Sequence, residues 1–235
     1  VTMEEQARLK LPCGGQLHVL LEFIDSNEQT CEVFKRLAGD LENHSKVSRR
    51  VDLTNGAISA EAQSSEDAVV IDGTQMTHSL SPMYRLLILG AGDVAKFVAE
   101  MAIALEYDVM LCDPRPNYLD NWSVPGVETT AQLPDDVVRE RFSNPYSGII
   151  ALAHDPRVDD MALMEALKTN AFYIGAMGSV KTSAARRERL PELGLSFDEI
   201  DRLHAPIGFQ INSKTPAEIA IAVMAEITSV RYQEK

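Results

Sequence analysis

The sequence predicts an α/β protein built on a parallel sheet, because a strand, a glycine turn and a helix follow one another. The apolar strand Arg85–Leu89 runs into Gly-Ala-Gly-Asp-Val-Ala at positions 90–95, and an apolar helical pattern continues from Val94 to Leu105. A second apolar run, Tyr107–Cys112, ends at Asp113, which lies 23 residues after the first glycine. This order, with an acidic residue about 20 positions on, is the dinucleotide-binding fingerprint of the Rossmann fold.

Each residue of the glycine turn has a physical role in that fingerprint. Gly90 permits the tight turn, and Gly92 lets a phosphate approach the backbone. Asp93 then opens a helix whose N-terminal N–H groups and partial positive charge favour an anion. The competing interpretation is a well-built turn that needs glycine only for its backbone conformation. For Gly90 and Gly92 we favour ligand binding.

Composition places the chain among soluble globular proteins. It has 235 residues, 45% hydrophobic and 24% charged, which allows one or two domains. No apolar run approaches the roughly 18 residues of a membrane span, and the N-terminus lacks the features of a signal peptide. We therefore expect a cytoplasmic protein. The net charge of −13 argues against binding to nucleic acid or anionic membranes and favours small ligands or protein partners.

The three cysteines form no Cys-x-x-Cys pair, so a disulfide scaffold or a self-contained zinc site is not expected. Cys13 follows Pro12 and precedes two glycines, and in such a turn a thiol is accessible to reagents and metals. The alternative for Cys13 is a small buried side chain. Cys31, in a predicted helix, and Cys112, in a predicted core strand, are expected to pack and to be poorly accessible.

We expect two domains, an N-terminal one over residues 1–83 and a Rossmann-like one over residues 84–235. The first should be small and mainly β, and either incomplete or dependent on the second domain or on another copy of the chain. Its expected elements are a strand over Leu17–Ile24, a helix over Glu28–Leu41, strands over Val47–Leu53, Ala57–Ala60 and Ala68–Ile71, and a linker over Thr74–Met83.

In the second domain, a long irregular loop follows Asp113, and such loops in compact α/β domains are more often functional than idle. The later elements are a helical turn over Val137–Phe142, a strand over Gly148–Ala153, a helix over Met161–Leu167, a strand over Ala171–Ile174 and a helix carrying Arg186, Arg187 and Arg189. The last helix begins at Thr215-Pro216-Ala217-Glu218, a capping box with proline at its first position.

The ends of the predicted parallel strands should meet at one edge of the sheet, where ligands bind in open α/β folds. The residues expected there are Gly90, Gly92, Asp93, Asp113, Arg115, His154, Asp155, Gly175, Gly178 and Ser179. Ser179 is also the expected N-cap of the next helix. His154 could be an acid–base group, a pH-sensitive contact or part of a cap, and His204 is expected in a loop. The three arginines fit a solvated helix face better than an anion clamp.

Several strings of this sequence together resemble the XdhC/CoxI family of molybdenum-hydroxylase maturation factors. They are Cys13-Gly14-Gly15-Gln16-Leu17-His18-Val19-Leu20, the 87–95 glycine segment, Asp113-Pro114-Arg115, Ala153-His154-Asp155-Pro156, Phe172–Ser179, Leu203-His204-Ala205-Pro206-Ile207-Gly208 and Lys214–Ala220. The likeness runs from Leu11 to Arg231.

The resemblance implies a cytoplasmic accessory protein, a chaperone more than an enzyme, for xanthine dehydrogenase and related hydroxylases. Such proteins bind molybdenum cofactor (molybdopterin), protect it while its terminal sulfur is installed, and pass it to the apoenzyme. The implied partners are the apo molybdenum hydroxylase, a cysteine desulfurase and a second copy of the chain. The family's upstream Ser-Gly-Gly-Cys element is not found, so the chain is expected to lack that portion. Cys13 is then the candidate metal ligand.

Two other functions stay open at this point. An NAD(P)-dependent oxidoreductase would use Asp113 to bind a ribose, although His154 is the only plausible start of a hydride-transfer site. If Asp113 contacts a ribose hydroxyl, NAD should bind more tightly than ligands with a 2′-phosphate, and Arg115 opposes this preference. The third function is a dimerisation or docking domain without a ligand. The sequence does not decide whether the cofactor carries a nucleotide.

Overall fold

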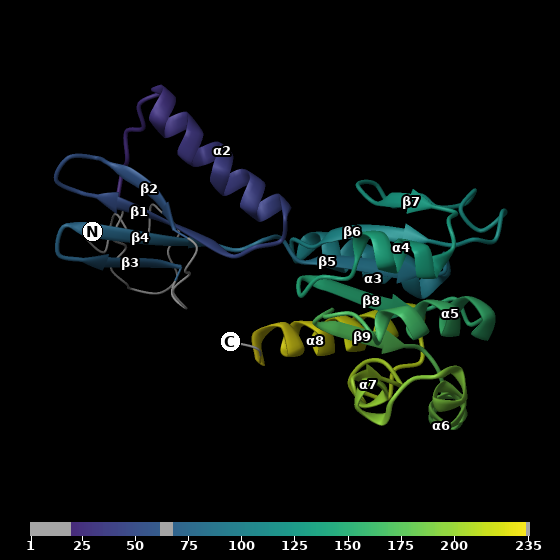
Figure 1. The fold of residues 1–235 in the computed structure, drawn as a ribbon. Helices are drawn as coiled ribbons and strands as arrows, with labels where there is room; N and C mark the ends of the chain where they lie inside the picture. Colours follow the sequence, from purple (N-terminus) through teal and green to yellow (C-terminus); the bar gives the residue numbers. More distant parts are fainter. Residues whose placement is uncertain (1–19, 62–67, 234–235) are drawn as a thin grey trace, which may run out of the picture.

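The computed structural model describes residues 20–61 and 68–233, which form two sheets (Figure 1). The N-terminal sheet is antiparallel in the order β2-β1-β4-β3. Its strands are β1 (Val47–Asp52), β2 (Ile58–Glu61), β3 (Val69–Asp72) and β4 (Gln75–Leu80). Helix α2 (Glu28–Glu42), capped by Asn27, packs against β1 and β2.

Two expectations for the N-terminal region are wrong. Residues 20–24 are irregular, so the predicted strand Leu17–Ile24 does not exist there, and its first three residues lie outside the described part. The predicted linker Thr74–Met83 contains β4, which pairs with both β1 and β3. Only Met76 of this strand is buried, and its other side chains are mostly polar and half-buried. Because β4 is held mainly by backbone hydrogen bonds to its neighbours, its sequence lacks the apolar alternation by which a strand is recognised.

The second sheet is parallel throughout and has the order β10-β9-β8-β5-β6-β7. Its strands are β5 (Arg85–Leu89), β6 (Asp108–Cys112), β7 (Glu128–Thr130), β8 (Ser147–Ala151), β9 (Tyr173–Ala176) and β10 (Leu203–His204). Numbered from β5, this is the 3-2-1-4-5-6 order of the doubly wound dinucleotide-binding fold. The predicted fold class is confirmed. The short strands β7 and β10 were not expected, and β10 contains His204.

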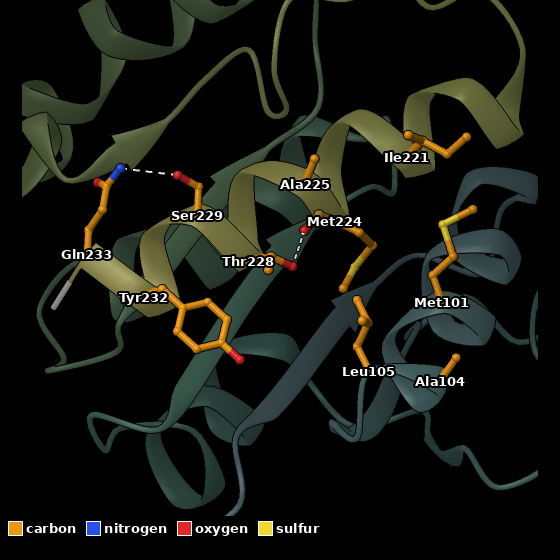
Figure 2. A pocket seen from close by; sticks show the side chains of 10 residues that line it. All are labelled: Met101, Ala104, Leu105, Ile221, Met224, Ala225, Thr228, Ser229, Tyr232 and Gln233. Atoms are coloured by element: carbon orange, nitrogen blue, oxygen red, sulfur yellow. Dashed lines mark hydrogen bonds between the residues drawn. The ribbon is translucent and has the colours of Figure 1, made fainter. Parts of the chain in front are cut away.

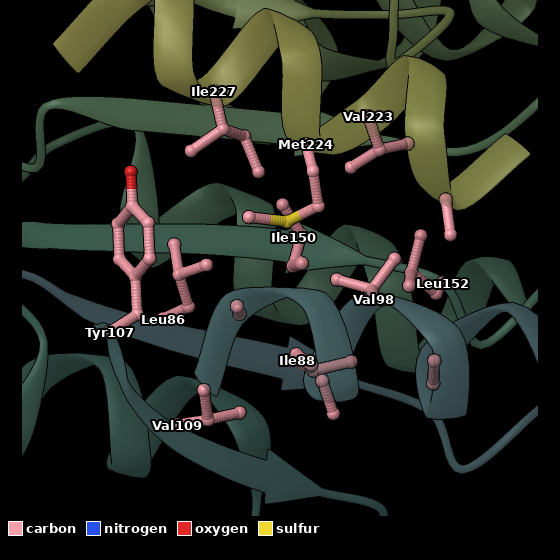
Figure 3. Close-up of a cluster of buried hydrophobic side chains, with 14 of the residues drawn as sticks. Leu86, Ile88, Val98, Tyr107, Val109, Ile150, Leu152, Val223, Met224 and Ile227 are labelled. Atoms are coloured by element: carbon pink, nitrogen blue, oxygen red, sulfur yellow. The ribbon is translucent and has the colours of Figure 1, made fainter. Parts of the chain in front are cut away.

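Alternate residues of β5 face opposite layers, as the two-residue period of a strand requires. Leu86 and Ile88 contact α3 (Asp93–Ala104) and α8 (Pro216–Gln233), where Val98, Val223 and Ile227 are buried (Figure 3). Leu87 and Leu89 point to the other layer, which contains α4 (Pro134–Arg141) and α5 (Pro156–Ala166). A strand buried on both faces explains why Arg85–Leu89 is apolar throughout.

The remaining helices follow β9 and are α6 (Val180–Arg189), the 3-10 helix η1 (Leu190–Leu193) and α7 (Phe197–Asp201). The predicted capping box of α8 is confirmed, because Glu218 accepts hydrogen bonds from the Lys214 and Thr215 N–H groups and Thr215 Oγ1 accepts one from Glu218 N–H. Within the described ranges, no helix is both long and apolar enough to cross a membrane.

Candidate crevice at the strand ends

The carboxyl ends of the central parallel strands meet at one edge, as expected. Leu89 is in register with Cys112 on one side and with Ala151 on the other, and Ala151 is in register with Ala176. The residues that follow these strands therefore lie side by side. The strand order reverses between β5 and β8, and doubly wound folds bind ligands outside the strand ends at such a switch point. We call this edge of the sheet, with the segments 90–93, 113–115 and 153–155, the candidate crevice.

The two glycines of the first turn differ in what surrounds them. Gly90 has φ +95°, and a Cβ built there would lie 2.4 Å from the Ala153 Cα, so packing alone requires glycine. Gly92 has φ −90°, and a Cβ there would meet nothing within 4 Å. Neither packing nor backbone conformation demands glycine at position 92. Open space above this backbone is what a phosphate needs for close approach.

Gly92 is also the N-cap of α3 and supplies no side-chain cap. Helix α4 also lacks a side-chain cap, whereas α2, α5, α6 and α7 each begin with a side chain that accepts a first-turn N–H. Asp93 opens the first turn of α3 and is exposed. Uncapped N–H groups at an exposed helix start are suited to bind an anion. Ala95, in the first turn of α3, is fully buried in the core cluster that contains Leu86 and Ile88 of β5.

Asp113 is completely buried and its carboxylate is held by neighbours. Its Oδ2 accepts the Ala91 N–H at 2.9 Å and Arg115 Nη2 at 2.7 Å, and its Oδ1 accepts Arg115 Nε at 2.8 Å and the Arg115 backbone N–H at 3.1 Å. Burial raises the pKa of Asp113, but these hydrogen bonds outweigh it and leave the pKa below its usual value. Asp113 therefore stays ionised and fixes the glycine turn to β6.

Arg115 reaches from β6 towards β8. Its Nη1 lies 3.4 Å from the Ala153 carbonyl oxygen, and its guanidinium carbon lies 3.6 Å from the centre of the Tyr118 ring. Tyr118 belongs to the irregular loop after β6. Apart from its place in this loop, nothing in the sequence indicated a role for Tyr118. Arg115 and Tyr118 thus form one side of the crevice.

His154 and Asp155 lie at the end of β8, on the opposite side. His154 is exposed and has φ +55°, an unusual backbone conformation for a residue other than glycine. The Asp155 carboxylate accepts the Arg157 N–H and caps α5. Hydrogen bonds from the Arg157 side chain and N–H lower the pKa of Asp155. The sequence left three roles open for His154 and Asp155, and the helix cap is confirmed for Asp155.

The second glycine segment begins inside β9, which contains Gly175, and both of its glycines lie against neighbouring side chains. A Cβ at Gly175 would lie 2.6 Å from the Ile207 side chain, and one at Gly178 would lie 2.6 Å from Thr182 Oγ1. The predicted N-cap is confirmed, because Ser179 Oγ accepts the Thr182 N–H. Gly178 and Ser179 also line a cavity of about 300 Å³ with residues 206–213. Gly175 does not line it.

A partly buried carboxylate holds the opposite wall of this cavity. Glu226, on α8, accepts the Tyr173 hydroxyl hydrogen bond and the Gly208 N–H at 2.8 Å. His204 Nδ1 lies 3.2 Å from Glu226 Oε1, and the His204 ring stacks on Tyr173. This cluster fixes the 205–208 segment, which begins with the cis peptide Ala205–Pro206. The sequence did not indicate it, because the four residues come from separate parts of the chain.

The interpretation of the α6 arginines as a solvated face is wrong for Arg186. Only 6% of Arg186 is exposed, and its Nε donates to Asp160 at 2.8 Å. Arg186 Nη2 lies 3.5 Å from Asp159, whose Oδ1 accepts the Ala153 N–H. Arg189 also binds Asp160, and Arg187 donates to two backbone carbonyls. Arg186 therefore supports the end of β8 through Asp159, Arg187 holds the segment around α7 and β10, and all three arginines are paired within the chain.

Of the cysteines, Cys112 is buried as expected, and Cys31 is exposed, contrary to the expectation that it packs. Cys31 faces outward because α2 covers the antiparallel sheet with its other side. Burial, with a smaller effect of the Asp113 charge, raises the pKa of Cys112 to about 12. Cys13, the predicted metal ligand, lies outside the described residues.

A larger apolar cavity of about 870 Å³ lies apart from this crevice, between α3 and α8 (Figure 2). Met101, Leu105, Ile221, Met224 and Tyr232 are among its lining side chains. Of the predicted site residues that the structure describes, none lines it. The described side chains around it carry no charge, so they offer no anchor for a phosphate.

Comparison with known proteins identifies the family. Residues 86–227, more than half of the chain, match the family described as the XdhC Rossmann domain. The chain belongs to the XdhC family. The match spans β5 to α8, so it contains the whole crevice and all of the predicted cofactor-binding residues. The resemblance inferred from the sequence is confirmed.

Two curated relatives carry functional names. The chain is 27% identical over 225 residues to the molybdenum cofactor insertion chaperone PaoD of Escherichia coli, covering 96% of this chain and 63% of PaoD. It is 27% identical over 153 residues to a Bacillus subtilis protein named as a probable subunit of xanthine dehydrogenase, covering 65% of this chain and 44% of that protein. The chain thus spans less than two thirds of the length of either relative.

The crystal structure of a xanthine dehydrogenase from Bacillus halodurans is similar in fold. It superposes with a TM-score of 0.66 at 23% identity and covers 89% of this chain and 66% of that one. At this level of identity the similarity establishes the shared fold. Because most of the chain is covered, the similarity extends beyond the 86–227 family match.

Proposed function

We propose that this XdhC-family chain binds molybdenum cofactor in the crevice at the strand ends and delivers it to an apo molybdenum hydroxylase of the xanthine dehydrogenase type. The cofactor is cargo in this proposal. The observation that carries it is the uncapped, exposed start of α3 at Gly92, where open space lets a phosphate reach the backbone. The name of the relative PaoD, a molybdenum cofactor insertion chaperone, supports the choice of cargo.

The residues present suit a phosphorylated pterin. Its phosphate would bind the N–H groups of Gly92 and Asp93 at the start of α3, with Gly90 shaping the turn. The cavity beyond Gly178 and Ser179, about 300 Å³, is at the lower end of the usual size for a small-molecule site. Its lining combines backbone with apolar and polar side chains, which matches a heterocycle that carries amide groups.

In this mechanism the chain binds and shields the cargo and makes no bond in it. When installed in the client enzyme, the cofactor's molybdenum supplies the hydroxylation chemistry. Asp113 and Arg115 would hold the glycine turn in place, and His154 and Asp155 would border the bound cargo. Cys13 would offer a thiolate to the metal, because a soft ligand suits molybdenum. We further propose a cytoplasmic homodimer that meets a cysteine desulfurase, so that the cargo receives its terminal sulfur while bound.

The molybdenum content of the purified chain tests this proposal. Chain produced in cells that make the cofactor should carry molybdenum and a fluorescent oxidised pterin, and Gly92→Val should lose both while staying folded. Gly39→Val is the matched control, since Gly39 in α2 is also free of contacts to an added Cβ. Wild-type chain without pterin, or Gly92→Val with full pterin content, would overturn the proposal.

An NAD(P)-dependent oxidoreductase is the second candidate, and the strand order of the parallel sheet favours it. The described crevice presents His154 as the only imidazole at its rim, without an adjacent hydrogen-bonding partner of the kind that orients a general base. Reduction of NAD by the purified chain with a panel of hydroxy acids and aldehydes would favour this candidate. A chain that binds neither pterin nor nucleotide would instead be a docking or dimerisation module.

A further inference from the structure

The carboxylate that a Rossmann fold normally offers to a ribose is already used in this structure. Asp113 is fully buried and accepts four hydrogen bonds, one from Ala91 and three from Arg115. A ribose diol that bound Asp113 would have to displace the Arg115 side chain from two bonds of 2.7 and 2.8 Å. Hydrogen bonds between charged groups are about twice as strong as neutral ones. The exchange is therefore unfavourable.

Arg115 keeps donors for a ligand. A guanidinium has five N–H groups. Among the described residues, three of them are used: Nε and one on Nη2 bind Asp113, and one on Nη1 faces the Ala153 carbonyl. The two that remain are one N–H on Nη1 and one on Nη2, at the terminal edge of the guanidinium, and no described residue accepts them. The Tyr118 ring beneath the guanidinium and the bidentate Asp113 contact hold this edge in one orientation.

The position of that edge is set by the sheet. Arg115 extends from the end of β6 to the end of β8, and it shares Asp113 with the Ala91 N–H of the glycine turn. About a quarter of its side chain is exposed. The Asp155 carboxylate also interacts electrostatically with Arg115 but is paired with Arg157, and Asp93 is exposed to solvent at the start of α3. The fixed cation thus stands beside an uncapped helix start.

We infer that Arg115, not Asp113, contacts the ligand of this crevice and selects one that carries a phosphate group at this end over one with a free ribose diol. This inference rests on the proposed function and names the ligand class of the same site. It assigns Arg115 as a specificity-determining residue with Tyr118 as its support. Planar, two-pronged donation to a phosphate is the contact for which arginine is best suited.

The test compares two dinucleotides that differ only in a phosphate. Binding of NADP, NAD and inorganic pyrophosphate is measured by calorimetry for wild type, Arg115→Gln and Arg139→Gln. Arg139, an exposed arginine on α4, controls for the loss of one positive charge. Wild type should prefer NADP and bind pyrophosphate. Arg115→Gln should lose about 10- to 100-fold in NADP affinity, as expected for lost hydrogen bonds to a charged group. Its NAD affinity should rise or stay constant, because Asp113 becomes available.

Arg115→Gln leaves Asp113 as a buried carboxylate without its partner, so its folding must be checked. The double variant Asp113→Asn/Arg115→Gln removes both charges and should show the same loss of NADP preference if the single variant is unstable. The inference would be overturned if the wild type bound NAD more tightly than NADP. It would also be overturned if the folded variants kept the wild-type ratio of NADP to NAD affinity.

The outcome for Arg115 is separable from that for the crevice itself. Suppose that Gly92→Val abolishes dinucleotide binding and molybdenum content while Arg115→Gln changes neither the preference for NADP nor the affinity for it. The crevice is then the binding site, and Arg115 does not select the ligand. If the wild type binds none of the three probes, the role of Arg115 also falls, and the molybdenum content alone then decides the proposed function.

Discussion

Gly90 lies so close to the end of β8 that a Cβ on it would stand 2.4 Å from the Cα of Ala153. The contact locks the first turn of the parallel sheet against the neighbouring strand, at the bottom of the crevice. Because the atoms concerned belong to the backbone on both sides, no rotamer change relieves the clash. Gly92, two residues on, faces open space.

Gly90→Ala should therefore destabilise the chain by about 3 kcal/mol or more, since it combines overpacking with a left-handed backbone at φ +95°. Gly92→Ala is the matched control and should lower the free energy of unfolding by only about 1 kcal/mol, because alanine is a poorer N-cap than glycine. Urea denaturation followed by circular dichroism measures both. Equal stability of the two variants would mean that the turn does not approach β8 as described.

Gly92→Val should remove ligand binding without unfolding the chain. The valine side chain would fill the space above the start of α3 and keep a phosphate from its N–H groups. A ligand at 100 times its dissociation constant stabilises by about 2.7 kcal/mol, which a thermal-shift assay with pyrophosphate or nucleotides detects. The shift should vanish in this variant and persist in Gly39→Val. Retained stabilisation would move the site away from this turn.

Asp159 should make the chain less stable as the pH rises from about 4 to about 6. Burial, only partly offset by the Ala153 N–H and by Arg186, raises the pKa of Asp159 to about 6 from its ordinary value of 3.8. A raised pKa means that the folded state binds the proton more tightly, so the stabilisation is present at low pH and is lost as the group ionises. The loss is on the order of 3 kcal/mol.

The readout is the difference in unfolding free energy between wild type and Asp159→Asn across this pH range. Wild type should lose stability relative to the variant as the pH rises. Asp155→Asn is a control of opposite sign, because the pKa of Asp155 is lowered by Arg157 and its contribution is lost as the pH falls. A flat difference for Asp159→Asn would show that folding does not raise the pKa of Asp159.

The three cysteines should react with iodoacetamide in a defined order. Cys112 is buried and its pKa is raised to about 12, so it should be labelled only after unfolding. Cys31 is exposed on α2 and should be labelled in the native state. For Cys13 we still predict the fastest reaction, because turn N–H groups favour the thiolate, and protection by bound cofactor.

Mass spectrometry of peptides from briefly labelled native protein measures this order. Cys13→Ala should weaken cofactor retention while changing the unfolding free energy by no more than about 1 kcal/mol. Faster labelling of Cys31 than of Cys13 would show that Cys13 has no activated thiolate. Native labelling of Cys112 would contradict the burial of β6.

Glu226→Ala should destabilise the chain by about 2–4 kcal/mol, because it leaves the buried Tyr173 hydroxyl and the Gly208 N–H without their acceptor. It should also release the segment that lines the cavity beside Ser179. Glu100→Ala, an exposed glutamate on α3, is the control. Denaturation and hydrogen exchange at residues 205–209 measure the two effects. Unchanged hydrogen exchange at residues 205–209 in Glu226→Ala would mean that Glu226 does not hold this segment in place.

Local patterns in the sequence determined the parallel sheet, its glycine turn and the helix caps. The caps Ser179 and Thr215 act through N–H groups within three residues, and the glycine at 90 takes a positive φ that its own turn requires. Such features can be recognised in the sequence without knowledge of the fold, because backbone conformation and helix capping are short-range effects. The same strings identified the family, and through it the proposed cargo.

Tertiary structure alone decided what each charged group does. Asp113 looked available for a ribose until Arg115 and Ala91 were placed on its two oxygens. Arg186 looked solvated until α5 brought Asp159 and Asp160 against it. Strand β4 was hidden because its pairing partners, not its own hydrophobic pattern, hold it in the sheet. Partners distant in sequence set the burial and pairing of these groups, and a one-dimensional pattern carries no record of which groups will meet.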